Sequence, residues 1–130
     1  MCISKLVDDL IGNWAGDPAG NVTTDLIRYL SGEAVDFSGY HVDLLHLTGF
    51  EQSVLRETRK IGCGSMITYS ELALAIGRPK AARAVGNALR KNPAPIVIPC
   101  HRVVAQNGIG GYVFGVDMKR RLLELEGVII

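Results

Sequence analysis

A cysteine and a histidine stand next to each other in the segment Pro99-Cys100-His101-Arg102-Val103-Val104. A thiol attacks as its thiolate, and a neighbouring imidazole can take its proton near neutral pH. The pair therefore predicts a nucleophile with its base. The alternative is a buried, inert cysteine beside a histidine that satisfies its own hydrogen bonds, and one adjacent pair does not decide between the two.

The other cysteines form no pattern of their own. The chain has three cysteines, widely spaced and without a Cys-x-x-Cys motif, so neither a disulfide framework nor a zinc knuckle is indicated. His41 and His46 are too far from Cys63 in sequence to form a recognisable ligand set. The spacing therefore gives no support for a structural metal.

Length and composition limit the class of protein. With 130 residues and an apolar fraction of 48%, the chain can bury one core and is short for two full-sized domains. It contains no apolar run long enough to span a membrane and no signal-peptide pattern at its N-terminus. We expect a cytoplasmic monomer without a membrane partner, associated with the nucleoid if the source is a prokaryote.

Charge is divided unevenly between the two parts of the chain. Residues 1–50 carry two basic and seven acidic side chains, whereas residues 51–130 carry twelve basic and six acidic ones. The densest basic stretch contains no acidic residue and includes Arg78, Lys80, Arg83, Arg90 and Lys91. Such a stretch is either a solvated helical face or a contact surface for a polyanion.

Two short helices joined by a tight turn are predicted to carry this basic stretch. The motif Thr68-Tyr69-Ser70-Glu71 is a capping box and predicts a helix over residues 69–76. Pro79 suits the first turn of a second helix over residues 79–91, which Asn92-Pro93 would end. The pair predicts a helix-turn-helix.

The second of these helices has one apolar face and one cationic face. Apolar residues at spacings of three and four predict the buried face, namely Ala81, Val85, Ala88 and Leu89. On the opposite side, long cations stand beside the small residues Ala82 and Gly86, which permit close approach to a groove. Because glycine costs about 1 kcal/mol in a helix relative to alanine, Gly86 favours a nucleic-acid surface over a helix chosen for propensity alone.

Further short elements complete the predicted architecture. Ile96-Val97-Ile98 is a buried run, and Pro99 restrains the backbone just before Cys100. The remaining predicted elements are helices over residues 5–14, 50–61 and 118–125, a helix capped by Thr23 or Thr24 and ending at Leu30, and a small strand over 112–115. We predict a mainly α chain with a small β component.

Taken together, these motifs resemble the O6-alkylguanine-DNA alkyltransferase family. The matching text runs in order from Thr48-Gly49-Phe50-Glu51 through the capping box, residues 79–86 and residues 92–104 to Leu122–Gly127. The resemblance implies direct-reversal DNA repair, in which a methyl or other alkyl group moves irreversibly from O6 of guanine to a cysteine. It implies one transfer for each protein molecule, without a cofactor.

The resemblance also implies a domain organisation. Residues 47–130 would form a helix-turn-helix, winged-helix-like domain that binds DNA and accepts the alkyl group. Residues 1–46 would form a shortened, mostly helical N-terminal segment in place of the family's usual domain with a β-sheet.

The residues that match the family's motifs inherit its roles as expectations. Cys100 is similar to the alkyl acceptor, His101 to the base that activates it through a water molecule, and Glu126 to the carboxylate that orients the histidine. Asn92 resembles the side chain that ties the helix-turn-helix to the active-site loop. Tyr69 resembles the tyrosine that assists departure of the guanine.

The implied partner is double-stranded DNA that contains O6-alkylguanine. Arg83 resembles the arginine that fills the gap when the damaged nucleotide is flipped out, a step needed because O6 lies inside the base stack. The set expected at the DNA is completed by Ala82, Gly86, Lys80, Arg90 and Thr68. The set expected around the substrate pocket is Val103, Tyr112, Val113 and Pro95, with the backbone carbonyls of Cys100 and Val103 reading the guanine amine.

One departure from the family's pattern keeps an alternative open. Tyr112-Val113-Phe114-Gly115 stands where the family commonly has a Tyr-Ser-Gly-Gly-like sequence, so Val113 replaces a serine near O6. The alternative is a non-catalytic, alkyltransferase-like protein that binds alkylated DNA. Such relatives lack the acceptor cysteine, and Cys100 therefore argues against it. A Cys-His hydrolase comes third, because nothing in the chain resembles its substrate site.

Overall fold

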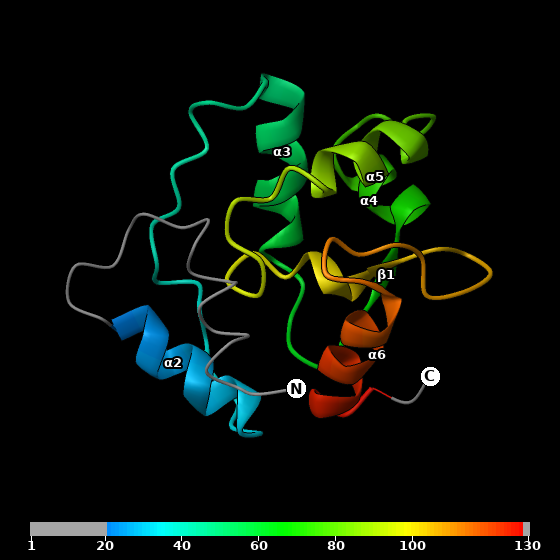
Figure 1. Ribbon diagram of the computed structural model, residues 1–130. Helices are drawn as coiled ribbons and strands as arrows, with labels where there is room; N and C mark the ends of the chain where they lie inside the picture. Colours follow the sequence, from blue (N-terminus) through cyan, green and yellow to red (C-terminus); the bar gives the residue numbers. More distant parts are fainter. Residues whose placement is uncertain (1–20, 129–130) are drawn as a thin grey trace.

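The computed structural model describes residues 21–128 of the chain. Within this range it is mainly helical, with five α-helices, one 3-10 helix and a two-stranded sheet (Figure 1). The elements in chain order are α2 (Asn21–Leu30), α3 (Gly49–Thr58), β1 (Ile67–Thr68), α4 (Tyr69–Ala75), α5 (Ala82–Leu89), η1 (Cys100–Arg102), β2 (Val103–Val104) and α6 (Val116–Leu125). The predicted mainly α fold with a small β component is confirmed, and the helix predicted over 5–14 lies outside the described residues.

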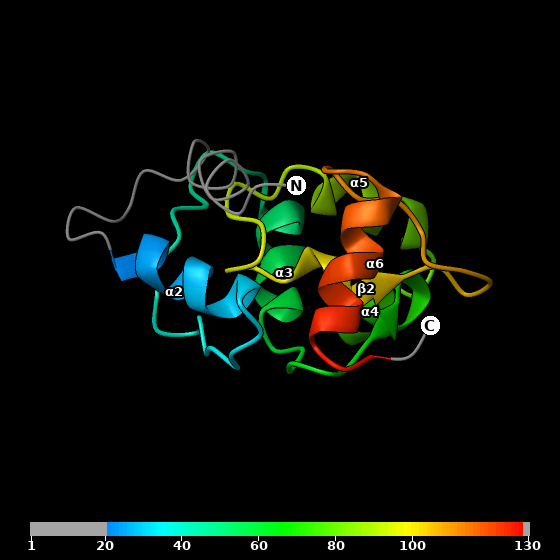
Figure 2. The same cartoon turned by 60° about the horizontal axis from the view of Figure 1, so that its bottom comes forward.

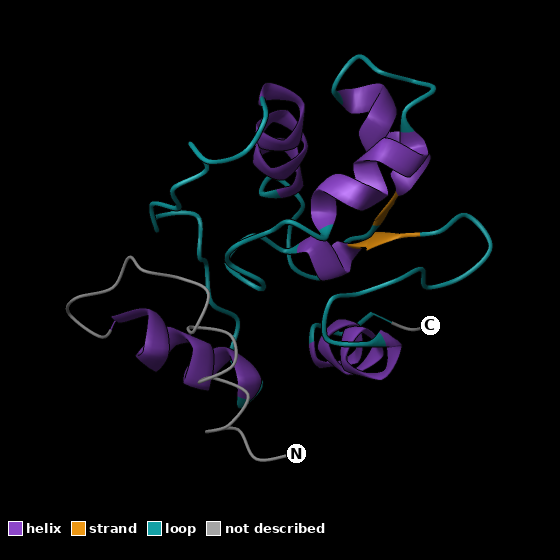
Figure 3. Ribbon diagram, turned by 45° about the horizontal axis from the view of Figure 1, so that its top comes forward, coloured by secondary structure: helices purple, strands orange, loops and turns teal. Residues whose placement is uncertain are grey.

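The helix-turn-helix consists of α4 and α5, which pack against each other and against α3 (Figure 3). Its capping box forms as predicted: the Glu71 nitrogen donates to Thr68 Oγ1 at 3.1 Å, and the Thr68 nitrogen donates to Glu71 Oε1 at 2.9 Å. The predicted start of the second helix is wrong. Pro79 lies in a turn, in which the Ala81 nitrogen donates to the Arg78 carbonyl, and α5 begins only at residue 82.

The sheet places the start of α4 beside the end of η1. Its two strands are parallel, with Ile67 paired to Val103 and Thr68 paired to Val104. Because β1 leads directly into α4 and η1 leads directly into β2, the Cys100 turn and the first residues of α4 meet at this sheet. Helices α3 and α6 both contact η1, and in Figure 2 α6 lies in front of β2 with α3 to its left.

Three other element predictions need correction. Residues 112–115 form a turn and no strand, since the Gly115 nitrogen donates to the Tyr112 carbonyl at 3.0 Å. The helix that follows begins at Val116, two residues earlier than predicted. Helix α2 begins by residue 21, so Thr23 and Thr24 lie inside its first turns and do not cap it.

The apolar core is one cluster to which every α-helix of the described range contributes. Helix α2 enters it through Val22, Leu26 and Tyr29, which are at most 2% exposed. Buried residues from both sides of the predicted boundary at residues 46 and 47 join this cluster, and the boundary itself stays a prediction. No helix within residues 21–128 is long and apolar enough to cross a membrane.

Candidate active site

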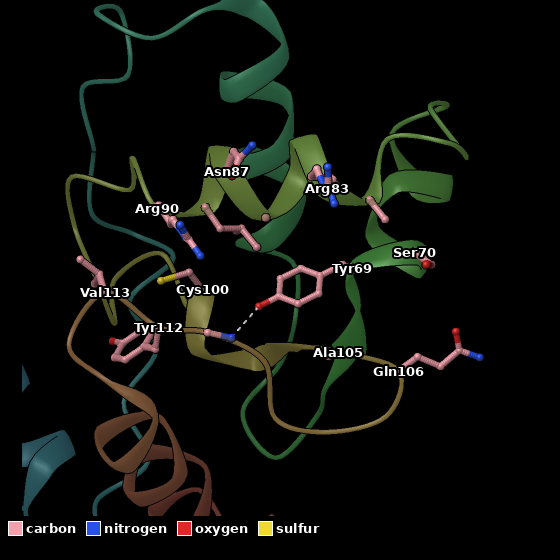
Figure 4. Close-up of a pocket in the computed structure, with 14 residues that line it drawn as sticks. Tyr69, Ser70, Arg83, Asn87, Arg90, Cys100, Ala105, Gln106, Tyr112 and Val113 are labelled. Atoms are coloured by element: carbon pink, nitrogen blue, oxygen red, sulfur yellow. Dashed lines mark hydrogen bonds between the residues drawn. The ribbon is translucent and has the colours of Figure 1, made fainter.

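A cavity of about 640 Å³ opens beside α5, and Cys100 forms part of its wall (Figure 4). One side consists of residues from α5 and the start of α4, and the other consists of residues 105–106 and 111–113. Arg83 and Asn87 of α5 and Arg90 just after its end line this cavity. A cysteine, two arginines, an asparagine and two tyrosines therefore line the same cavity.

The side chain of Asn92 folds the loop that delivers Cys100. Its amide nitrogen donates to the Ile98 carbonyl at 2.8 Å, and its oxygen accepts from the Ala94 nitrogen at 2.9 Å. The Cys100 nitrogen then donates to that same Ile98 carbonyl at 2.8 Å. Asn92 thus links the end of the helix-turn-helix to the backbone of the cysteine.

One residue of this loop has a strained backbone. Ile96 has a φ of +75°, the only non-glycine residue with positive φ between residues 21 and 128. A β-branched side chain in this region is costly, on the order of 1–3 kcal/mol, and persists only where the surrounding packing determines it. The Ile96 side chain is 2% exposed, so its burial holds the turn that leads to Cys100.

Behind the cysteine, His101 is bonded to a fully engaged carboxylate. His101 Nε2 lies 2.7 Å from Glu126 Oε2, and Arg102 donates to both oxygens of Glu126 at 2.8 and 3.0 Å. Tyr29 donates a further hydrogen bond to Glu126 Oε2. These donors outweigh the burial of Glu126, which alone would raise its pKa, and lower that pKa to about 2. Glu126 is therefore a carboxylate at neutral pH.

This carboxylate defines the tautomer of His101. Because Glu126 can only accept, Nε2 of His101 carries the ring proton and Nδ1 is left as a lone-pair acceptor. Nδ1 is buried and makes no hydrogen bond to any residue between 21 and 128. Burial lowers the pKa of His101 despite the opposing hydrogen bond and charge of Glu126. The imidazole is thus a neutral base with one open nitrogen.

The thiol of Cys100 is held in its neutral form. Burial raises its pKa to about 11, against the hydrogen bond from Asn92 and the positive charge of Lys119, which favour the thiolate. A neutral thiol beside a neutral base means that the proton must move when the thiol reacts.

Lys119 on α6 is a fully buried cation, and its Nζ lies 5.6 Å from the centroid of the Tyr69 ring. Its Nζ donates to the Val103 carbonyl at 2.6 Å and to the Gly111 carbonyl at 2.9 Å. These two carbonyls lie on either side of the loop that lines the cavity, so Lys119 closes that loop. Burial lowers the pKa of Lys119 to about 8, while the nearby Cys100 favours its charged form.

Tyr69 stands across the cavity with its hydroxyl directed at residues 110–111 (Figure 4). The Gly111 nitrogen donates to this hydroxyl at 3.3 Å, which leaves the hydroxyl proton of Tyr69 available to another acceptor. The ring lies against Gly86 on one side, where an added Cβ would be 3.9 Å away, and against Gly110 on the other. Two glycines therefore frame Tyr69.

The structure brings most of the predicted site residues to the cavity. Those in its wall are Tyr69, Ala82, Arg83, Gly86, Arg90, Cys100, Tyr112 and Val113. Thr68 instead caps α4, and Lys80 lies in the turn before α5. Pro95 and Val103 do not line the cavity, because both are buried in the protein interior and the Val103 carbonyl accepts from Lys119.

Three residues near the site were not predicted from the sequence: Tyr29, Arg102 and Lys119. Lys119 had a usable signal, since it lies between Met118 and Leu122 on the buried face of α6. Tyr29 and Arg102 had none, because their partner Glu126 is 97 and 24 residues away in sequence. No group of His, Cys, Asp and Glu residues suited to a metal ion occurs between residues 21 and 128.

Comparison with known proteins gives consistent matches. The sequence model of one family, described as "6-O-methylguanine DNA methyltransferase, DNA binding domain", matches residues 49–128. A methylated-DNA–protein-cysteine methyltransferase of Metallosphaera sedula is 48% identical over 105 residues, which are 81% of this chain and 65% of that protein. This chain thus spans just under two thirds of that relative's length.

Solved structures agree with the sequence matches. Mycobacterium tuberculosis OGT in complex with DNA has a TM-score of 0.78 at 42% identity, covering 82% of this chain and 66% of that one. S. pombe Atl1 in complex with damaged DNA containing O6-carboxymethylguanine has a TM-score of 0.53 at 35% identity, covering 62% of this chain and 78% of that one.

Proposed function

The chain belongs to the O6-methylguanine-DNA methyltransferase family, and we propose that it repairs DNA by moving a methyl or other alkyl group from O6 of guanine to Cys100. One observation carries the proposal: a buried thiol faces a cavity beneath a cationic helix and has a carboxylate-bound imidazole next to it in the chain. The cavity beneath a cationic helix suits a base that is flipped out of DNA. The imidazole bonded to a carboxylate suits the activation of a thiol nucleophile.

The proposed transfer uses each of these groups once. His101 Nδ1 takes the thiol proton through a water molecule, and Glu126 stabilises the resulting imidazolium. The Cys100 sulfur then forms a bond to the alkyl carbon as the bond between that carbon and guanine O6 breaks, and its electron pair goes to the guanine. The hydroxyl of Tyr69 donates to the departing base. The product is a thioether, which thiol exchange does not reverse, so each molecule acts once.

The proposed substrate is double-stranded DNA that contains O6-alkylguanine. Arg83 on α5 and Arg90 just after its end are exposed at the cavity, and such cations would neutralise phosphates or enter the duplex. We assign Arg83 to the gap that the flipped nucleotide leaves, and Ala82 and Gly86 to close contact with the groove. Residues 47–130 would form this DNA-binding and acceptor unit, and the protein would act in the cytoplasm, at the nucleoid if the source is a prokaryote.

Intact-mass measurement tests the transfer directly. The protein is mixed with excess duplex oligonucleotide carrying O6-methylguanine, and we expect a mass gain of one methyl group, located on Cys100 by peptide mapping. Cys63→Ser is the matched control and should still gain the methyl group, whereas Cys100→Ser should not. An unmodified protein after exposure to saturating lesion would refute the proposal. Tight binding with unchanged lesion content would instead establish the non-catalytic alternative.

A further inference from the structure

We propose that Tyr29 is a positioning residue for the alkyl transfer: its hydroxyl holds the Glu126 carboxylate and, through it, fixes the imidazole of His101. The inference rests on the proposed function, because it concerns the base that would activate Cys100. Tyr29 lies in α2, outside the residues 49–128 that match the family. A residue that precedes the family-matched residues 49–128 would therefore complete the active site that those residues form.

The Tyr29 hydroxyl is aimed at the contact between His101 and Glu126. It donates to Glu126 Oε2, the same oxygen that lies 2.7 Å from His101 Nε2. The Tyr29 oxygen also lies 3.4 Å from that Nε2. With Arg102 donating to both carboxylate oxygens, Tyr29 supplies the donor that approaches the pair from α2.

The ring of Tyr29 is fixed, so the hydroxyl has a defined direction. Tyr29 is 2% exposed, and its ring packs edge-on against Phe37 with 5.8 Å between the centroids. Phenylalanine would fill the same apolar space. A buried hydroxyl is unfavourable unless it is hydrogen-bonded, and here its hydrogen bond goes to the carboxylate that orients the base.

The charge on Glu126 is shared among its donors. Each hydrogen bond to a carboxylate stabilises its negative charge and weakens its pull on the remaining donors. Removal of the Tyr29 hydroxyl would therefore strengthen the attraction between Glu126 and a protonated His101. The titratable groups that face this pair from the surrounding elements are Tyr29, Cys63, Cys100, Arg102, Tyr112 and Lys119. A Tyr29→Phe substitution leaves all the others in place.

The test compares Tyr29→Phe with Tyr40→Phe. The hydroxyl of Tyr40 also donates to a carboxylate, that of Asp25, whose other oxygen accepts from Arg28. The readout is the titration of His101 followed by NMR, with His41 and His46 as internal references. We expect Tyr29→Phe to raise the pKa of His101 by about half a unit and Tyr40→Phe to leave it unchanged. The apparent pKa on the acid side of the pH–rate profile for methyl transfer should rise by the same amount. Below that pKa, the transfer rate should therefore fall roughly threefold.

A double-mutant cycle shows whether Glu126 carries the effect. In a Glu126→Gln background, Tyr29→Phe should no longer shift the titration of His101. A second measurement compares the wild-type protein with Glu126→Gln, both of which keep Tyr29. The NMR resonance of the Tyr29 ring carbon that bears the hydroxyl should move in Glu126→Gln, and the matching resonance of Tyr40 should stay in place. An unchanged His101 titration in Tyr29→Phe, or an unmoved Tyr29 resonance in Glu126→Gln, would overturn the proposal. If the wild-type protein transferred no methyl group, the proposed function would fail, and the titrations would still decide the role of Tyr29.

Discussion

Replacing Gly110 with alanine tests how tightly the cavity loop is built around Tyr69. Gly110 has a φ of +77°, and an added Cβ would stand 2.6 Å from the Tyr69 hydroxyl and 3.1 Å from the Ala105 nitrogen. Gly77 has the same φ of +77°, and no non-neighbouring heavy atom within residues 21–128 lies within 4 Å of its Cβ position. Gly77→Ala is therefore a control that has the backbone strain and lacks the steric clash.

The two substitutions should differ clearly in the free energy of unfolding. A left-handed backbone costs an alanine about 1 to 2 kcal/mol, which is the loss we expect for Gly77→Ala. Gly110→Ala adds overpacking of about 1 to 3 kcal/mol, because the Ala105 nitrogen belongs to the backbone and cannot swing away. Urea unfolding of both variants measures this difference.

The clash should also reach the proposed chemistry. Because the Tyr69 ring must move to admit the new methyl group, Gly110→Ala should slow methyl transfer, whereas Gly77→Ala should not. Tyr69→Phe removes the closest clashing atom and should restore part of the stability that Gly110→Ala loses. Equal losses of unfolding free energy in the two alanine variants would refute the reasoning.

Three further predictions concern the DNA surface and the buried carboxylate. Gly86→Ala should raise the free energy of unfolding by up to about 1 kcal/mol, since the new Cβ would lie 3.9 Å from the Tyr69 ring, an ordinary contact distance. The same substitution should weaken binding of alkylated duplex DNA in a gel-shift assay. Unchanged affinity would show that this face of α5 is not part of the DNA interface. Arg83→Ala should slow repair of duplex DNA and spare the reaction with free O6-methylguanine, and equal slowing would contradict its role in the gap. The pKa of Glu126 is lowered from 4.5 to about 2 in the folded protein, so its contribution to stability, about 3 kcal/mol, should be present above pH 4.5 and disappear as the pH falls toward 2. The free energy of unfolding, measured with urea at each pH across this range, should fall less steeply with falling pH for Glu126→Gln than for the wild-type protein. Equal pH dependence in the two proteins would disprove the assignment.

Local sequence rules predicted the elements whose signals are themselves local. The capping box at Thr68 needs only the carboxylate three residues later, and it forms as the sequence predicts. The same signal is present at Thr48 and Glu51, where it begins α3. Pro79 misled the prediction of α5, because proline suits a turn as well as the first turn of a helix.

The site was predictable only where its residues sit in one stretch of chain or in a motif of the family. Cys100 and His101 are adjacent, and Asn92 closes its hydrogen bonds within six residues. The spacing of Met118 and Leu122 could have placed Lys119 on the buried face of α6, but its carbonyl acceptors at Val103 and Gly111 come together only after folding. Tyr29 depends on α2 docking against a carboxylate 97 residues away, and no spacing rule reaches that far.

The resting state of the thiol suits the proposed single use of each protein molecule. Burial raises the pKa of Cys100 to about 11, and the same burial keeps His101 neutral. An exposed thiolate would react with any alkylating agent it met and would be spent without repairing DNA. In the proposed transfer, the proton leaves as the imidazole accepts it, and Glu126 is already ionised to balance the new charge. The groups that favour the thiolate, Asn92 and Lys119, lower the pKa of Cys100 without overcoming its burial, so in the proposed transfer the thiol needs His101 to take its proton as the sulfur attacks.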